Sequence, residues 1–127
     1  MDKANIKTIE INGVQYVQAD SILAAPAIDV DGLPCVIVRS GQAGVFCGYM
    51  RERDRATKVV VLDRAIRMWR WTGFTLSQVA RDGIAGNGEN RFGIQTDGHE
   101  IGDVCEIIPC SAKARAAIEA VEPRVVG

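Results

Sequence analysis

The sequence predicts an α+β fold: an antiparallel sheet of about six strands with one short helix and one C-terminal helix. Three observations lead to this prediction. Short apolar, β-branched runs recur along the chain and are separated by turn residues, which is typical of antiparallel strands. Thirteen glycines in 127 residues supply those turns. Helix-terminus signals mark only two segments, residues 75–83 and 111–121.

Length and composition indicate one globular domain over residues 1–127. Hydrophobic residues make up 47% of the chain, which is enough apolar surface for a core without disulfides or metal ions. No apolar stretch approaches the roughly 18 residues of a membrane span. Residues 1–5 are polar and no apolar signal core follows, so we expect a cytosolic protein. The net charge of −1 argues against a general coat for DNA or RNA.

The first elements are predicted strands. Two alternating runs joined by Asn12-Gly13 predict an N-terminal hairpin over residues 6–17. Residues 35–39 and 45–50 flank a glycine-containing turn and should pair antiparallel. The β-branched run at residues 57–62 is typical of a central strand. Residues 63–72 fit either a strand or a helix, and their aromatic content favours a strand.

The second half of the chain carries both helices. Thr75 is a suitable N-cap and Gly83 a suitable C-terminal glycine for a two-turn helix over 75–82. Strands are expected at 91–96 and 104–108, with a turn at Asp97-Gly98. Ser111 begins an alanine-rich helix over 111–121. Its apolar stripe has helical spacing and consists of Ala114, Ala117, Ile118 and Val121.

Established signatures of metal sites and catalysis are lacking in the sequence. The four cysteines form no CxxC pair and His99 is the single histidine, so we expect reduced thiols, most of them buried, and no zinc site of usual spacing. His99 lies among turn residues, where a lone histidine is more often solvated than catalytic. No GxxxxGK[ST] phosphate loop is present. We therefore expect a protein that is not an enzyme and needs no cofactor.

Positive charge concentrates in residues 51–81, which hold eight Lys/Arg, three Asp/Glu and both tryptophans. Guanidinium groups clamp phosphates through paired N–H groups, and tryptophans stack on bases. The segment predicts a site for an anionic ligand with flat rings, formed by Arg64, Arg67, Trp69, Trp71 and Phe74. The alternative is a solvated basic surface with two tryptophans in the core.

Two further segments supply candidate ligand-binding residues. The glycine-rich residues 83–88 are either a plain connector or a flap over a ligand, and they are followed by Asn90, Arg91 and Phe92. The start of the last helix offers backbone N–H groups to an anion, and Ser111, Lys113 and Arg115 lie there. Cations in a first helical turn oppose the helix dipole, which points to a role toward a ligand or partner rather than the helix. The alternative is that they are ordinary solvated charges.

From residue 35 onward the chain resembles a known family. The resemblance is carried by Val36–Arg39, Ala43–Tyr49, Val59–Leu62, Arg67–Gly73, Leu76–Ala80 and Glu106–Ser111. Its most specific parts are the paired tryptophans before Gly73 and the run Ile-Ile-Pro-Cys-Ser at 107–111. Over about residues 35–121 the chain is similar to the family of the first Thoeris anti-defence protein, a group of small phage and prophage proteins.

The resemblance implies a sponge that binds the cyclic ADP-ribose variant made by bacterial TIR-domain defence enzymes and does not cleave it. It also implies, for some members, a second site for the cyclic oligonucleotides of CBASS-type immunity. Dimers and hexamers whose pockets draw on more than one subunit are the implied assembly. The segment Gly86–Arg91 departs from the family, whose members carry Pro and Cys near the end of this loop.

Residues and resemblance together predict a homo-oligomeric phage protein that sequesters a cyclic nucleotide in the bacterial cytosol. Two rival functions stay open. One is an interaction module that inhibits a host enzyme directly through the basic face. The other is a hydrolase for the nucleotide.

Overall fold

The computed structural model describes residues 9–11, 14–16, 27–29, 31–72, 75–84 and 89–125. β1 (Ile9–Ile11) and β2 (Val14–Tyr16) pair antiparallel and form a two-stranded sheet of their own. Both strands lie inside the hairpin predicted over residues 6–17.

The other strands form one six-stranded antiparallel sheet, which confirms the predicted α+β class. Neighbours follow the order β6–β5–β4–β3–β8, and β7 pairs with the first part of β5. The elements are β3 (Cys35–Ser40), β4 (Gly44–Asp54), β5 (Val59–Arg70), α2 (Leu76–Asp82), β6 (Arg91–Thr96), β7 (His99–Ile101), β8 (Val104–Pro109) and α3 (Ala112–Glu119). β7 has no counterpart among the predicted strands, because its three residues lie among turn-forming residues.

The segment that fits either a helix or a strand in sequence is the second half of β5, a single strand of 12 residues. A bulge interrupts it at Arg64, whose φ of 51° lies in the left-handed region. The backbone N–H of Arg64 donates to Asp97 Oδ1 at 2.8 Å, which holds the bulge in place. Because of the bulge, Leu62 and Ala65 face the same core although they are three residues apart.

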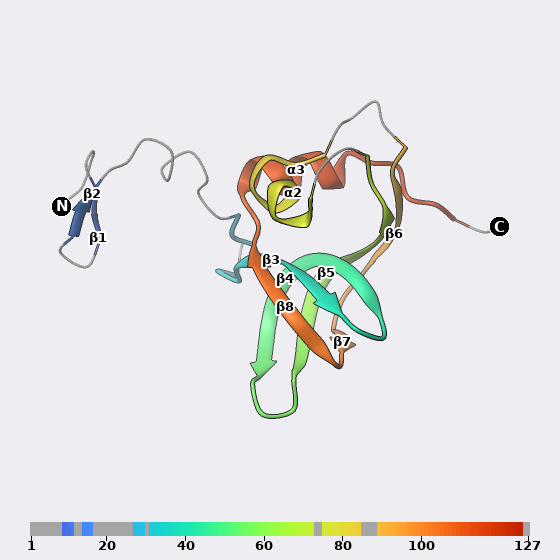
Figure 1. Ribbon diagram of the computed structural model, residues 1–127, viewed down its shortest axis with the longest axis horizontal. Helices are drawn as coiled ribbons and strands as arrows, with labels where there is room; N and C mark the ends of the chain where they lie inside the picture. Colours follow the sequence, from blue (N-terminus) through green and yellow to red (C-terminus); the bar gives the residue numbers. More distant parts are fainter. Residues whose placement is uncertain are drawn as a thin grey trace.

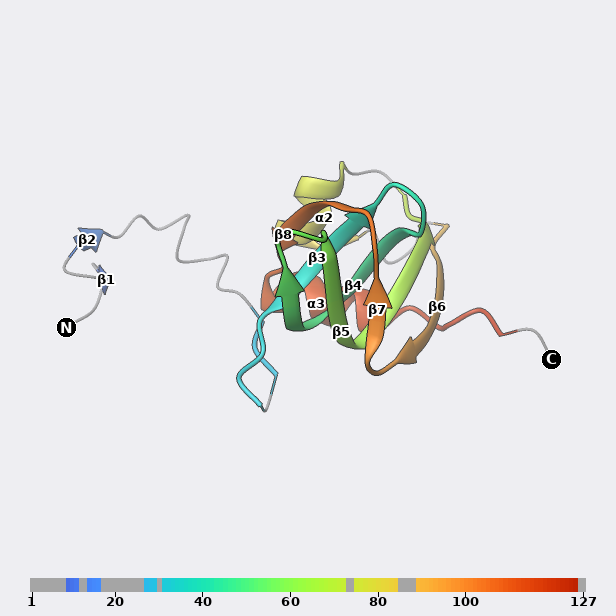
Figure 2. The same ribbon diagram turned by 90° about the horizontal axis from the view of Figure 1, so that it is seen from below.

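The sheet curls back on itself, and both helices lie together on one side of it (Figures 1 and 2). The core inside the curl consists of Val36, Val38, Phe46, Val60, Leu62, Ala65 and Ile101. The N–H of Val104 donates to the carbonyl of Lys58 at 3.0 Å, which joins the start of β8 to the turn before β5. A second core, the helix-side core, lies between the opposite sheet face and the helices. It includes Ile37, Cys47, Met68, Val79, Phe92 and Ile118. One sheet thus serves two cores.

Both helices begin at the predicted caps. Thr75 Oγ1 accepts from the N–H of Gln78, and Gly83 follows α2 with a φ of 93°. Ser111 Oγ accepts from the N–H of Ala114 at 3.0 Å, and the same hydroxyl donates to the carbonyl of Arg81 at 2.6 Å. Ser111 therefore joins the start of α3 to the end of α2. In the part of the chain that the structure describes, no helix has the length and apolar character needed to cross a bilayer.

Candidate functional site

A hollow of about 220 Å³ opens along β5 and β6, on the sheet face that carries Phe46 and Ala65, and is a candidate site for a ligand. It is lined by Ala65, Arg67, Trp69, Gly93, Ile94, Thr96, His99 and Arg124. The hollow contains two of the predicted ligand-binding residues, Arg67 and Trp69. Its lining also brings in a histidine and an arginine that the sequence did not indicate.

The pleat of β5 turns Trp69 outward, since Met68 before it points into the helix-side core. Trp69 is 58% exposed, which is unusual for so large an apolar side chain. Its indole lies over Gly93 of β6: a Cβ at that glycine would stand 3.6 Å from Trp69 Cη2. That distance is an ordinary van der Waals contact, so the indole packs directly against β6 at Gly93.

Arg67 is held beside the indole by two contacts. Its Nη1 donates to the carbonyl of Ala43 at 3.2 Å. Its guanidinium carbon lies 4.6 Å from the centre of the Phe46 ring, a cation–π distance. None of its other guanidinium nitrogens has a partner among the residues that the structure describes. Arg67 is thus oriented by the fold and retains donors for an anion.

His99 and Arg124 complete the hollow. His99 Nδ1 lies 2.7 Å from Thr96 Oγ1, and the imidazole packs edge-on against Phe46 at 4.9 Å. Burial, together with the nearby charge of Arg67, holds the pKa of His99 below its ordinary value of 6.5. The N–H of Arg124 donates to the carbonyl of Phe92 at 2.9 Å, and this bond lays the segment after α3 along β6.

The chemistry of this lining suits binding better than catalysis. Two guanidinium groups and one exposed indole are groups that hold phosphates and flat rings. Among the residues that the structure describes, none of those lining the hollow is an aspartate or a glutamate. Near neutral pH the imidazole is uncharged, because its pKa is lowered.

Arg64 and Trp71 belong to the opposite side of the sheet. Arg64 forms ion pairs with Asp29 at 3.0 Å and with Glu119 at 3.4 Å, and it stacks over Tyr49. Trp71 is half-buried against the helix-side core. Arg64 is three residues from Arg67, an odd separation that places the two side chains on opposite faces of a strand, and Trp71 lies beyond the end of β5 at Arg70.

The residues around the glycine-rich loop are also dispersed. Phe74 and residues 85–88 lie outside the described residues, so the flap hypothesis stays a prediction. Asn90 Oδ1 accepts from the N–H of Thr72 at 3.2 Å, and the Arg91 guanidinium pairs with Glu89 at 2.9 Å. Phe92 is only 1% exposed and is part of the helix-side core, so it is not available to a ligand on the surface.

The start of α3 requires a correction. Ser111 is buried, and its hydroxyl is used to cap α3 and to contact α2. The side chain of Arg115 is 3% exposed and lies in the interior, so its position in the first helical turn reflects packing rather than a surface anion. Lys113 is exposed, and it is the member of this group that faces solvent.

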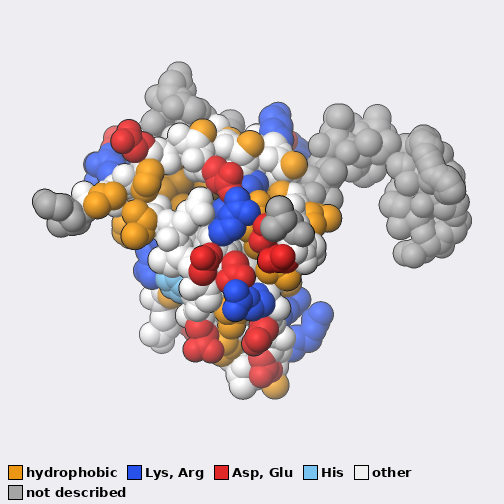
Figure 3. Space-filling view, turned by 180° about the vertical axis from the view of Figure 1, so that it is seen from behind, with side chains coloured by type: hydrophobic (Ala, Val, Ile, Leu, Met, Phe, Trp, Pro, Cys, Tyr) orange, Lys and Arg blue, Asp and Glu red, His pale blue; other side chains and the backbone are white. Residues whose placement is uncertain are grey.

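The basic segment does not form a continuous basic surface. Arg51 pairs with Asp63, and Arg81 pairs with Asp82. Figure 3 shows acidic and basic side chains interleaved down the middle of one face of the molecule. This pattern is unsuited to a polyanion such as DNA, and it leaves the hollow as the more focused site for an anion.

Comparison with known proteins identifies a family for the chain, but finds no relative of established function. A model described as a domain of unknown function, DUF6948, matches residues 33–118. No curated protein and no solved structure matches the chain. The matched range covers β3 to nearly the end of α3, and therefore includes the lining of the hollow except Arg124.

Proposed function

Because the chain belongs to the DUF6948 family of domains of unknown function, its activity has to be inferred from its own geometry, and we propose that it binds an anionic ligand carrying a flat ring and holds it without cleavage. One observation carries the proposal: an exposed indole, Trp69, lies beside an oriented guanidinium, Arg67, in a hollow. Stacking on such an indole contributes about 1–3 kcal/mol per base.

We propose further that the ligand is a cyclic nucleotide signal of bacterial immunity, and that the protein is a phage anti-defence sponge. The resemblance to Thoeris anti-defence proteins supports this class, with cyclic ADP-ribose isomers first and cyclic oligonucleotides second. In such a ligand the adenine would stack on Trp69, and the phosphates would lie between Arg67 and Arg124. A sponge of this kind would act in the cytosol of the infected bacterium.

The size of the hollow supports a shared site. About 220 Å³ is below the 300–1,000 Å³ that most small-molecule sites occupy. A second copy of the chain, seated over the hollow, would enclose the remaining surface of the ligand. The proposal therefore includes a homo-oligomer, a dimer or a hexamer, whose partner subunit completes the site.

The test is a capture-and-release experiment with a cyclic ADP-ribose isomer. Wild-type protein should remove the nucleotide from a filtrate and return it intact after heat denaturation. Arg67→Ala and Trp69→Ala should each lower affinity about tenfold or more, because each removes a principal contact. Trp69 is exposed, so Trp69→Ala should keep the wild-type melting temperature, whereas Arg67 is half-buried and its variant is compared with wild type at a temperature where both are folded.

Arg55→Ala is the matched control, because Arg55 is an exposed arginine in the turn before β5, outside the lining of the hollow. It should bind as tightly as wild type. Degraded nucleotide after heating would mean a hydrolase. Full capture by both hollow variants would remove this site from the proposal.

A second function has one observation in its favour. Ile94 lies on β6, which is an edge strand of the sheet, and its side chain is 56% exposed. It lines the hollow together with Trp69 of β5. Exposed apolar pairs on a sheet edge are typical of protein interfaces. No nucleotide capture, together with an assembly that Ile94→Lys dissociates, would favour an interaction module over a sponge.

A further inference from the structure

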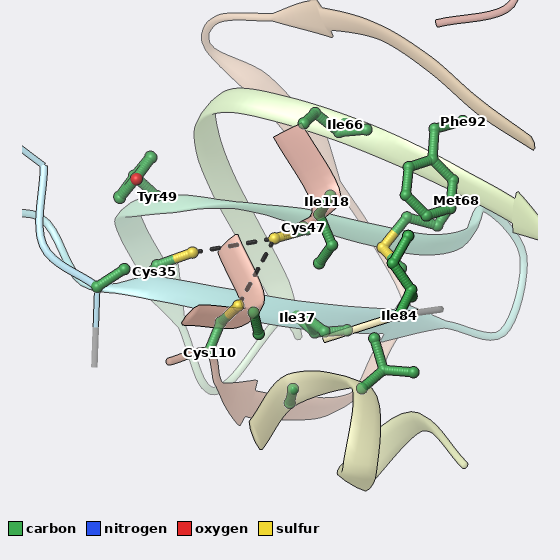
Figure 4. Close-up of a cluster of buried hydrophobic side chains, with 14 residues drawn as sticks. Cys35, Ile37, Cys47, Tyr49, Ile66, Met68, Ile84, Phe92, Cys110 and Ile118 are labelled. Atoms are coloured by element: carbon green, nitrogen blue, oxygen red, sulfur yellow. Dashed lines mark hydrogen bonds between the residues drawn. The ribbon is translucent and has the colours of Figure 1, made fainter. Parts of the chain in front are cut away.

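Three cysteines far apart in the sequence meet beneath α3 (Figure 4). Cys35 lies in β3, Cys47 in β4, and Cys110 between β8 and α3. The Sγ atom of Cys47 is 3.9 Å from that of Cys35 and 3.9 Å from that of Cys110, and the three sulfurs all lie within 4.8 Å of one another. Each cysteine is 0% exposed.

Backbone pairing sets this arrangement independently of the side chains. In the β3–β4 register, Cys35 faces Tyr49 and Ile37 faces Cys47, so the two cysteines are diagonal neighbours on one sheet face. The N–H of Cys110 donates to the carbonyl of Cys35 at 2.9 Å, which brings the third thiol alongside. Three segments of the main chain therefore hold the sulfurs in place before any ion binds.

The spacing of the sulfurs matches a metal–thiolate centre. Two separations of 3.9 Å and a third no longer than 4.8 Å define a triangle. The point equidistant from its corners lies about 2.3–2.5 Å from each sulfur, close to the ~2.3 Å of a zinc–thiolate bond. An ion of that size fits with shifts of a few tenths of an ångström.

A buried cation lies against the cluster. Arg115 Nη1 is 3.4 Å from Cys47 Sγ, and also donates to the Cys47 carbonyl at 3.2 Å. A guanidinium at this distance favours the thiolate form of a cysteine, which is the form that binds a metal ion. Three thiolates around a divalent ion carry one excess negative charge, and this guanidinium is placed to offset it.

We propose that Cys35, Cys47 and Cys110 form a binding site for a thiophilic metal ion, with Zn²⁺ as its probe. Thiolate sulfurs select ions of this class. Binding replaces the thiol protons, so up to three protons pass to the buffer for each ion bound. The site ties β3, β4 and the start of α3 together, and it lies on the opposite face of the sheet from the Trp69 hollow. It does not depend on the proposed sponge function.

The test uses the full chain, reduced and freed of metal with a chelator. Equimolar Zn²⁺ should bind one ion per chain in competition with a chromophoric chelator, raise the melting temperature, and release protons. Cd²⁺ should add thiolate charge-transfer absorption in the ultraviolet. Because the three thiols are buried even without metal, alkylation is done at a urea concentration that opens the core of the metal-free chain. Mass mapping should then show the three thiols labelled without metal and protected with it, and Cys105, which is exposed, labelled equally in both.

The matched controls are Cys105→Ser, which should retain full metal binding, and Cys110→Ser, which should weaken it at least tenfold. Because Cys110→Ser alters the core, the alkylation map of the wild-type chain stands as the decisive readout. Equal labelling of all four thiols with and without Zn²⁺ would overturn the proposal. Isolation of the chain with a disulfide inside the cluster would overturn it as well.

Discussion

Arg115 carries a positive charge into the interior, where its partners come from β4, β5 and its own helix. Its Nη2 donates to the carbonyl of Arg64 at 3.0 Å, its Nε to Glu119 at 2.6 Å, and its Nη1 to the carbonyl of Cys47. The guanidinium also stacks over Tyr49 at 4.8 Å. A single side chain thus satisfies two carbonyls of the central strands and fixes α3 to the sheet.

Arg115→Met should destabilise the protein by about 3 kcal/mol, because it leaves two buried carbonyls without this donor and removes the shorter of the two ion pairs of Glu119. Urea unfolding followed by circular dichroism measures this. Lys113→Met is the matched control: it makes the same change two residues earlier on α3, but at an exposed side chain. It should stay within about 0.5 kcal/mol of wild type. Equal losses for both variants would contradict the structural role of Arg115.

At the scale of single elements, α2 and α3 differ in how their caps are built. Ser111 is buried and its hydroxyl makes two hydrogen bonds, one within α3 and one to the end of α2. Thr75 is exposed, and its hydroxyl accepts one longer bond of 3.4 Å from Gln78. The cap of α3 therefore also joins the two helices, whereas the cap of α2 acts on α2 alone.

Ser111→Ala should lower the free energy of unfolding by about 1–2 kcal/mol, since it removes a cap and leaves the Arg81 carbonyl without this donor. Thr75→Ala should cost about 0.5–1 kcal/mol, the lower end of cap substitutions. Chemical denaturation of both variants side by side gives the comparison. A larger loss at Thr75 than at Ser111 would show that the helix–helix bond contributes nothing.

At the scale of the whole molecule, acid acts on stability through two kinds of group. His99 has a lowered pKa in the fold, so the unfolded chain binds the proton more tightly. Its contribution is complete above pH 6.5 and is lost as the pH falls through the lower, folded value. Asp63 has a pKa below its ordinary 3.8 because Gly98 N–H and Arg51 donate to it, and its contribution is lost at still lower pH.

Stability should therefore fall in two stages as the pH is lowered from 7. In His99→Gln the first stage, just below pH 6.5, should flatten, while the acid stage should stay as in wild type. Urea midpoints measured at half-unit steps of pH separate the two. A first stage of unchanged depth in the variant would assign it to another group.

Much of the fold follows from local chemistry, and the ligand site follows only in part. Thr75, Gly83 and Ser111 mark helix ends through their own hydrogen bonds and dihedral angles, so their positions are readable in sequence. Arg67 and Trp69 are adjacent by strand alternation and meet as expected. Arg124 joins them only because its segment packs along β6, and nothing in the residues next to Arg124 predicts that contact.

The chain alone determines its α+β class, the limits of its helices and a basic, aromatic strand, because these depend on residues within a few positions of one another. Tertiary structure decides which faces those residues share. The bulge at Arg64 brings Ala65, and with it Arg67, to the same sheet face as Leu62, and Arg115 is drawn into the core. Cys110 reaches Cys35 only through the pairing of β8 with β3, across more than seventy residues. Such contacts depend on strand partners that sequence periodicity does not specify.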